Sequence, residues 1–238
     1  MVAVGRRHLP RGWADLGRQL AIWFGFAVLY QLARGFADRN PSKAIANGYH
    51  IVHFETRVAS KLYELTFQNF VDQRHLLETA VSWTYWLSEF AVLGLAVLWV
   101  YLRRHDQFVG FRNSVLLANV IGLFGYVFVP TAPPRLLGVG FVDTHRDGLV
   151  NLAANPYAAM PSLHAADALI VAVVLFSVCR SPWAKAIWAL WPAWVIFAVM
   201  ATGNHFWLDC LAGFGVAILA MTAVYNKRVR RVFAARRA

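Results

Sequence analysis

The sequence predicts an all-α integral membrane protein with six transmembrane helices and an outer amphipathic helix between the first and second of them. Two features of the composition predict this class: 59% of the 238 residues are hydrophobic, and only 15% are charged. The mean hydropathy of +0.48 agrees with it. A soluble domain carries about 25% charged residues, so the composition argues against one. Because no internal repeat or linker is evident, we expect residues 1–238 to form a single membrane domain.

Six apolar stretches reach or approach the length of about 20 residues with which an α-helix crosses the hydrocarbon core. The first follows several arginines, as a signal peptide would, but its apolar part is long and the residues after it make a poor cleavage site. We therefore expect a retained span. The third and fourth stretches are short, and we expect them to extend into polar regions lined by protein. In chain order the stretches are 16–33, 81–102, 115–130, 165–178, 183–201 and 206–225.

The basic residues are distributed unevenly between the loops. The net charge of +11 comes from 23 Lys and Arg against 12 Asp and Glu, a surplus that in a soluble protein would indicate a nucleic-acid partner. With the N-terminus inside, 15 of the 23 lie at the termini and in the short inner loops, and most of the other eight lie in two long outer loops. The positive-inside rule then places both termini in the cytoplasm and accounts for the charge without nucleic acid.

The loop between the first two stretches is long for a membrane bundle, at roughly 45 residues. Apolar residues recur in it at near-helical spacing, with Glu55, Lys61 and Glu64 on other faces, so we expect an amphipathic helix on the outer surface, as a lid or a plug. The apolar positions are Ile45, Tyr49, Val52, Val58, Leu62, Leu65 and Phe70.

Polar side chains that are energetically unfavourable within a membrane stand at the predicted outer ends of three spans, in VPTAPPRLLG, AAMPSLHAAD and TGNHFWLD. Prolines end the third span just before Arg135, and Ser162 and His164 stand where the fourth begins. His205 and Asp209 are four apart on one helical face at the start of the sixth. Ionisable groups at membrane depth are functional candidates. The predicted topology puts all three clusters at the same membrane face.

These residue types fit a phosphoryl-transfer centre that needs no metal. A neutral His205 can attack phosphorus if its other nitrogen donates to a carboxylate, and Asp209 is in place to accept. His164 can protonate the departing oxygen, and Arg135 can hold two phosphoryl oxygens in its fork. Ser162 and N–H groups at its helix start add donors for phosphate. No carboxylate cluster of the kind that binds Mg²⁺ is present in the sequence, so we expect no metal and no cofactor.

Each of these residues also has a purely structural interpretation. His205 and Asp209 could be a hydrogen-bonded pair at a helix start, His164 could be a satisfied histidine of a first turn, and Arg135 could anchor the chain at the interface. Asp167, three residues after His164, is expected to make a polar contact inside the bundle. The four-residue pattern P-S-x-H has only about 0.01 chance occurrences at this composition, which favours the functional interpretation.

At PSLH and GNHFWLD the sequence resembles the type 2 phosphatidic acid phosphatase superfamily, whose signature is a Lys/Arg-Pro motif, a P-S-x-H motif and a Ser-Arg motif ending in H-x-x-x-D. The form APPR…PSLHAA…GNHFWLD is most similar to the branch of the aureobasidin-sensitive inositol phosphorylceramide synthases and their bacterial relatives. The resemblance covers about residues 85–225. It implies a six-helix membrane fold, a phosphohistidine on His205 oriented by Asp209, His164 as acid and base, and Arg135 as phosphate ligand.

The chain departs from the broader superfamily at two phosphate-binding cations. Phe128 stands where the superfamily has Lys, seven residues before Arg135, and Ala198 and Val199 stand where it has Ser-Arg. These departures favour the phosphotransferase-like branch over a plain lipid phosphatase. Arg146 or a residue of the long outer loop are candidates to replace the missing cations.

The leading hypothesis is therefore an enzyme of the cell membrane that transfers a phosphoryl group from a lipid at the extracytoplasmic face. An alcohol acceptor such as inositol makes it a phosphotransferase, and water makes it a phosphatase of a phospholipid or a polyprenyl phosphate. The alternatives are a non-catalytic lipid-phosphate transporter or scramblase, and a purely structural bundle. The expected partners are the membrane and a lipid-phosphate substrate, without nucleic acid. Nineteen Arg against four Lys are typical of a GC-rich bacterial genome.

Overall fold

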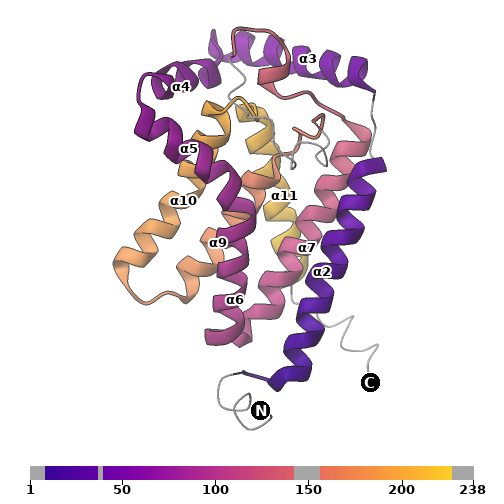
Figure 1. Cartoon of the computed structure of the whole chain (residues 1–238), viewed down its shortest axis with the longest axis vertical. Helices are drawn as coiled ribbons and strands as arrows, with labels where there is room; N and C mark the ends of the chain where they lie inside the picture. Colours follow the sequence, from indigo (N-terminus) through magenta and orange to yellow (C-terminus); the bar gives the residue numbers. More distant parts are fainter. Residues whose placement is uncertain (1–8, 37–39, 142–155, 227–238) are drawn as a thin grey trace.

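Helices run side by side along one axis, and two further helices, α3 and α4, lie across one end of them (Figure 1). The computed structural model describes residues 9–36, 40–141 and 156–226, and within these ranges the only β-type pairing is one isolated bridge. The helices are α2 (Gly12–Phe36), α3 (Pro41–Ala59), α4 (Tyr63–Asp72), α5 (His75–Leu87), the π-helical turn η1 (Ser88–Val92), α6 (Leu93–Arg103), α7 (His105–Phe128), the 3₁₀ turn η2 (Pro134–Leu136), α9 (Leu163–Val178), α10 (Pro182–Ala201) and α11 (Trp207–Tyr225).

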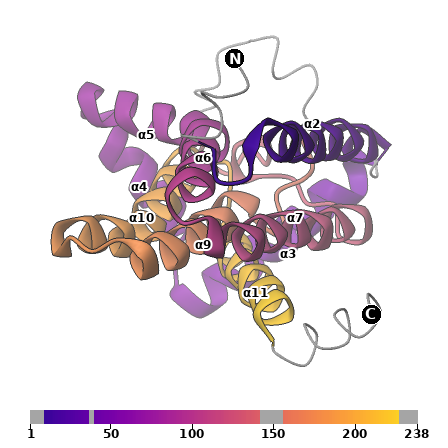
Figure 2. The same ribbon diagram turned by 90° about the horizontal axis from the view of Figure 1, so that it is seen from below.

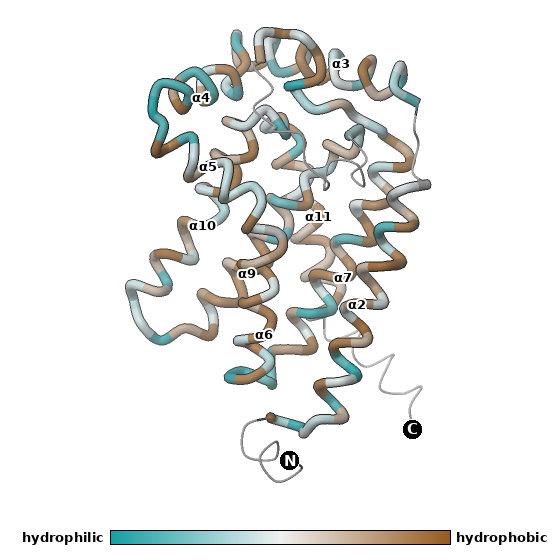
Figure 3. The backbone as a smooth tube through the Cα atoms, in the orientation of Figure 1, coloured by the Kyte–Doolittle hydropathy of each residue, from teal (hydrophilic) through white to brown (hydrophobic). Residues whose placement is uncertain are grey.

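The all-helical membrane class is supported by the length and exposure of these helices. Within the described residues α7, α10 and α11 are long and apolar enough to cross a membrane, and the α5–α6 pair, bent by 53°, adds a fourth span if it crosses as one. Large apolar side chains on the long helices are exposed, as lipid contact requires, while α3 and α4 are more polar (Figure 3). The α9 helix is apolar but shorter, at 16 residues. The predicted count of six spans therefore stays a prediction.

The helix that contains the predicted third span begins ten residues before that span, because α7 begins at His105 and carries Arg112 inside the helix. The reason is a polar network where α2, α6 and α7 meet. Arg112 donates to the Gln19 side chain, and the Asp15 carboxylate accepts from the Tyr101 hydroxyl at 3.0 Å. An apolar stretch defined by hydropathy ends at a charged residue such as Arg112. In the structure the helix continues through Arg112, because the guanidinium has a hydrogen-bond partner.

The α9 helix lies at the centre of the bundle, between α7, α10 and α11 (Figure 2). Its residues are apolar around the whole circumference, which is the pattern of a buried helix rather than of a surface helix. The one acid in it, Asp167, is buried, and its carboxylate oxygens lie 3.4 and 3.5 Å from the Asn119 side-chain nitrogen of α7. This is the polar contact inside the bundle that the sequence predicts.

The start of α9 and the body of α11 approach one another at the level of the backbone. A Cβ atom placed on Gly213 of α11 would lie 2.1 Å from the carbonyl oxygen of Ser162 and 3.3 Å from the Cβ atom of Ala165. Gly125 of α7 makes a similar approach, since a Cβ there would lie 2.3 Å from the Pro161 ring. The segment that begins α9 therefore packs directly on the backbones of α7 and α11 at these two glycines.

We expect Gly213→Ala to lower the free energy of unfolding by about 1–3 kcal/mol, because the added methyl group must push two backbones apart. The matched control is Gly215→Ala on the same helix, where an added Cβ meets nothing within 4 Å. Thermal unfolding of both variants in detergent measures the difference. Equal melting temperatures for the two variants would contradict the close approach.

The segment between α2 and α5 forms two helices instead of one, and the face that carries its acids is buried. The chain turns at Ser60, where a φ of +61° ends α3 before α4 begins. Glu55 and Glu64, which the spacing put on faces other than the apolar one, are completely buried, while the apolar Phe54 and Val58 are exposed. The physical reason lies at the first turn of α11, which offers these carboxylates backbone N–H groups.

Candidate active site

The first two polar clusters are joined by backbone hydrogen bonds between their loops. The N–H of Thr131 donates to the carbonyl of Tyr157 at 2.8 Å, and the N–H of Ala159 donates to the carbonyl of Thr131 at 3.2 Å. These bonds form the isolated parallel bridge of the structure, between Thr131 and Ala158. The loop that follows α7 therefore lies directly against the loop that precedes α9.

The third cluster, where α11 begins, is bonded to both of the others. The N–H of Arg135 donates to the carbonyl of Gly203, and the N–H of Ser162 donates to the carbonyl of Asp209, both at 3.0 Å. All three clusters consequently meet at the end of the bundle beneath α3 and α4 (Figure 1). The expectation that they share one end of the bundle is confirmed.

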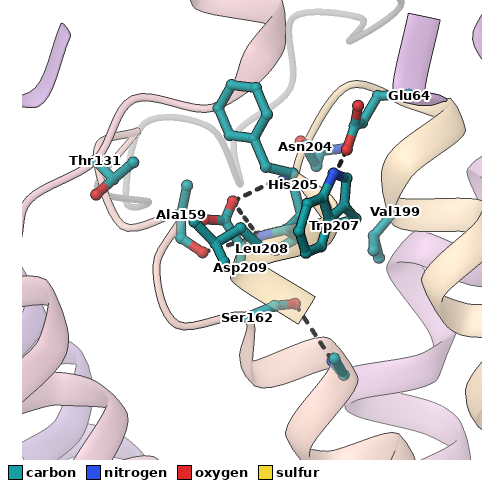
Figure 4. A network of polar contacts seen from close by, with 12 residues as sticks. Glu64, Thr131, Ala159, Ser162, Val199, Asn204, His205, Trp207, Leu208 and Asp209 are labelled. Atoms are coloured by element: carbon teal, nitrogen blue, oxygen red, sulfur yellow. Dashed lines mark hydrogen bonds and ion pairs between the residues drawn. The ribbon is translucent and has the colours of Figure 1, made fainter. Parts of the chain in front are cut away.

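His205 is held by the turn between α10 and α11. The N–H groups of Asn204 and His205 both donate to the carbonyl of Val199, and Gly203 supplies the left-handed conformation of the turn with a φ of +65°. His205 is only 5% exposed, and its Nδ1 atom lies 2.8 Å from the carbonyl oxygen of Ala159 (Figure 4). A carbonyl oxygen can only accept, so Nδ1 carries the proton and the lone pair of the neutral ring is on Nε2.

Asp209 stands one turn after His205 but is not its direct hydrogen-bond partner. Its Oδ2 atom accepts from the N–H of Phe206 at 2.9 Å and lies 3.6 Å from Nδ1 of His205. We expected Nδ1 to donate to this carboxylate, and the structure gives that place to the Ala159 carbonyl. The carboxylate caps α11 and remains close enough to stabilise a positive charge on the imidazole.

His164 faces His205 from the first turn of α9. The two imidazole rings have their centroids 5.6 Å apart and are inclined by 59°. On its other side His164 stacks on Tyr85 of α5, with centroids 4.7 Å apart and an angle of 20° between the planes. The structure thus brings the two predicted histidines together. Tyr85 was missed by sequence reasoning, since nothing distinguishes it from the other aromatic residues of its helix.

Arg135 is oriented by a neighbour of His205. Its Nε atom donates to the Asn204 side-chain oxygen at 3.1 Å, and the Asn204 amide nitrogen in turn donates to the Thr202 hydroxyl at 2.8 Å. Asn204 is buried, while Arg135 is partly exposed. The guanidinium of the first cluster is therefore fixed against the turn that carries the candidate nucleophile.

Ser162 is the N-cap of α9. Its hydroxyl oxygen accepts from the N–H of Ala165 at 3.3 Å, and the whole residue is buried. Capping of this kind is the usual function of serine before a first helical turn, and it holds His164 in that turn. The predicted contact of Ser162 with a substrate phosphate stays a prediction.

Two buried glutamates, one from α3 and one from α4, contact the start of α11 and were not predicted to belong to the site. Oε1 of Glu64 accepts from the N–H of Trp207 at 2.6 Å (Figure 4), and Oε1 of Glu55 accepts from the N–H of Leu208 at 3.0 Å. Burial, together with the negative charge of Glu64, raises the pKa of Glu55 to about 9, and burial also raises the pKa of Glu64. The sequence gives one indication of them, two acids among the apolar residues of the outer loop.

The positions of the two missing cations carry no basic group. Phe128 is exposed on the outside of α7, and Ala198 and Val199 are fully buried in α10. Arg146, the proposed substitute, lies outside the described residues. Among the residues that the structure does describe, no three His, Cys, Asp or Glu side chains gather in a way that could hold a metal ion.

A helical membrane bundle that gathers an arginine, two histidines and a carboxylate at one end has the architecture of the integral-membrane phosphatases and phosphotransferases. The family description "PAP2 superfamily" matches residues 50–223. The chain belongs to the PAP2 superfamily.

Two named proteins resemble the chain. A phosphoinositol dihydroceramide synthase of Bacteroides thetaiotaomicron is 26% identical over 156 residues, which cover 56% of this chain. The chain spans about half the length of this curated relative, 50%. The crystal structure of Aquifex aeolicus LpxE superposes with a TM-score of 0.55 at 21% identity, over 67% of this chain and 92% of that protein. This likeness shows a shared fold.

Proposed function

We propose that the protein transfers a phosphoryl group from a membrane lipid through a phosphohistidine intermediate on His205. The observation that carries the proposal is the hydrogen bond from Nδ1 of His205 to the Ala159 carbonyl, beside the ring of His164. This bond leaves Nε2 with the lone pair that a nucleophile needs. A histidine that only supported the fold would not need a second imidazole at this distance.

The first half-reaction forms the covalent intermediate. Nε2 of His205 attacks phosphorus while the bond from phosphorus to the leaving oxygen breaks, and protonated His164 gives its proton to that oxygen. Asp209 stabilises the positive charge that develops on the imidazole of His205. The two terminal nitrogens of Arg135 hold the phosphoryl oxygens.

The second half-reaction regenerates the histidine. His164, now neutral, takes a proton from the acceptor hydroxyl, whose oxygen attacks phosphorus and displaces Nε2 of His205. An alcohol as acceptor gives a phosphotransferase, and water gives a phosphatase of a phospholipid or polyprenyl phosphate. The name of the Bacteroides relative supports the alcohol, in particular transfer of a phosphoinositol group to a ceramide-type lipid.

We further propose that the site faces the extracytoplasmic side of a bacterial cell membrane. The distribution of basic residues supports this, because the inner loops and the termini hold 15 of the 23. In this orientation α3 and α4 cover the outer end of a bundle of six spans, with α2 as the first. Lipid head groups then reach the site from the outer leaflet.

The proposed chemistry predicts a reaction that survives removal of metal ions. Purified protein is incubated with phosphatidylinositol labelled in the inositol, with dihydroceramide as acceptor, and separately with phosphatidic acid and water. We expect the rate with EDTA to equal the rate without it, because the phosphorus is activated by Arg135 and two histidines. The control adds excess Mg²⁺ after EDTA. Loss of activity with EDTA and its recovery with Mg²⁺ would overturn this mechanism.

A further inference from the structure

Three consecutive backbone N–H groups at the start of α11 are each bound by a different carboxylate. Phe206 donates to Asp209 at 2.9 Å, Trp207 donates to Glu64 at 2.6 Å, and Leu208 donates to Glu55 at 3.0 Å. Only the first of these acids belongs to α11. The other two come from α4 and α3, about 140 and 150 residues earlier in the chain.

These bonds change what the start of α11 can do. Free N–H groups at a helix start attract anions and would be a natural place for a substrate phosphate. Here protein carboxylates occupy them, directly after the candidate nucleophile His205. Three N–H groups at the start of α11 are therefore occupied by carboxylates, two of which come from α3 and α4.

The burial of two glutamates beside one another favours a proton on one of them. Glu55 and Glu64 are both completely buried, and the negative charge of Glu64 adds to the effect of burial in raising the pKa of Glu55. Protonated Glu55 still accepts from the N–H of Leu208 through its carbonyl-type oxygen. Asp209 is the other acid whose charge acts on both. A pair that keeps one proton carries a single negative charge next to the helix start.

The same outer helix is bonded to the loop that carries Arg135. The carbonyl of Ala44 accepts from the N–H of Ala132 at 3.0 Å, and the Asn47 side chain donates to the carbonyl of Pro130 at 2.8 Å. A third bond runs from the Tyr49 hydroxyl to the carbonyl of Leu137 at 2.6 Å. The α3 helix thus links the arginine loop to the helix that follows His205.

We propose that Glu55 and Glu64 are positioning residues, which tie the outer helices to the first turn of α11 and thereby set His205 against His164 and Arg135. The inference rests on the proposed phosphoryl transfer, because it assigns the two acids to the geometry of that reaction. On this proposal α3 and α4 do more than cover one end of the bundle, because they hold the candidate active site in its geometry.

The test compares alanine and amide variants of the two acids. For Glu55→Ala and Glu64→Ala we expect kcat to fall about 10- to 100-fold with little change in KM, as is typical when a group that orients a reacting residue is lost. For Glu55→Gln we expect most of the activity to remain, because the amide oxygen accepts from the N–H of Leu208 as protonated Glu55 does and the side chain carries no charge. The control is Gln68→Ala, a buried polar residue one turn later on α4, which should keep the wild-type kcat.

A pH profile separates positioning from simple stabilisation. Glu55 keeps its proton at neutral pH and loses it as the pH rises through about 9, after which two buried negative charges face each other near Asp209. We expect wild-type kcat to fall above that pH and the Glu55→Gln variant to lose this step. Equal profiles for the two proteins would overturn the assignment of Glu55, and so would a Glu55→Ala variant with wild-type kcat.

Hydrogen–deuterium exchange supplies a measurement that needs no turnover. Amides of the peptide that contains Trp207 and Leu208 should exchange faster in Glu55→Ala and Glu64→Ala than in wild type or Gln68→Ala. If the two alanine variants exchange faster but neither wild type nor any variant is active, the proposed function is rejected, while the bonds from Glu55 and Glu64 to α11 are supported. Unchanged exchange would reject the tie itself.

Discussion

His205→Ala is expected to lower turnover by roughly 10⁴-fold or more, since the variant lacks the group to which we assign the nucleophilic attack. The measurement is transfer or release of labelled head group by purified wild type and variant. Incubation of wild type with a donor labelled in phosphorus should leave a covalent label that is stable in base and labile in acid, as a phosphoramidate is. The variant should carry no such label.

His205→Asn is the companion variant, because asparagine keeps a polar side chain at the buried position but offers no nucleophile. Its melting temperature shows whether a loss of activity reflects unfolding. A folded His205→Ala protein that retains a tenth of the wild-type rate would exclude His205 as the phosphoryl acceptor. The reaction would then need direct attack by the acceptor on the lipid.

Arg135→Ala is expected to lower kcat/KM by about 10²- to 10³-fold, the usual loss when a charged donor to a transition-state oxyanion is removed. Arg135→Lys should recover only part of this, since the ammonium cannot donate in a fork. The lysine variant also lacks the 3.1 Å hydrogen bond from Nε of Arg135 to the side-chain oxygen of Asn204, which orients the guanidinium. The measurement is steady-state kinetics with the same labelled donor.

The two variants together distinguish catalysis from lipid transport. A transporter or scramblase that only binds a lipid phosphate would tolerate His205→Asn and fail with Arg135→Ala, as measured by redistribution of a fluorescent lipid in vesicles. A phosphoryl-transfer enzyme fails in both variants when product is measured. Lipid redistribution that survives His205→Asn, with no product from wild type, would support the transporter.

Much of the fold was accessible from the sequence, because apolar length and proline positions determine where membrane helices begin and end. The helix predicted over 183–201 is Pro182–Ala201, and the one over 206–225 is Trp207–Tyr225. The expectation that the three polar clusters meet also followed from this topology. The start of α7 did not, since Arg112 is paired by Gln19 of a helix far away in the chain.

The parts of the site that escaped prediction depend on partners that are not encoded locally. Helical spacing puts Asp209 beside His205, but the atom that accepts from Nδ1 is a backbone oxygen of Ala159, whose position is fixed only by the fold. The spacing put Glu55 and Glu64 on faces other than the apolar one, because such a pattern depends only on the polarity of the side chains. In the structure the two acids are buried because they accept from N–H groups at the start of α11 that would otherwise have no partner. Buried polar groups must pair.

The bond from His205 to the Ala159 carbonyl has a consequence for how this site tolerates change. The tautomer of the imidazole is selected by the main chain, and a main-chain oxygen is present whatever side chain follows it. Side-chain substitutions near His205 that leave the main chain in place therefore keep the proton on Nδ1 and the lone pair on Nε2. If His205 is the nucleophile, as we propose, its reactive nitrogen is determined by the fold, and the neighbouring side chains can vary independently of it.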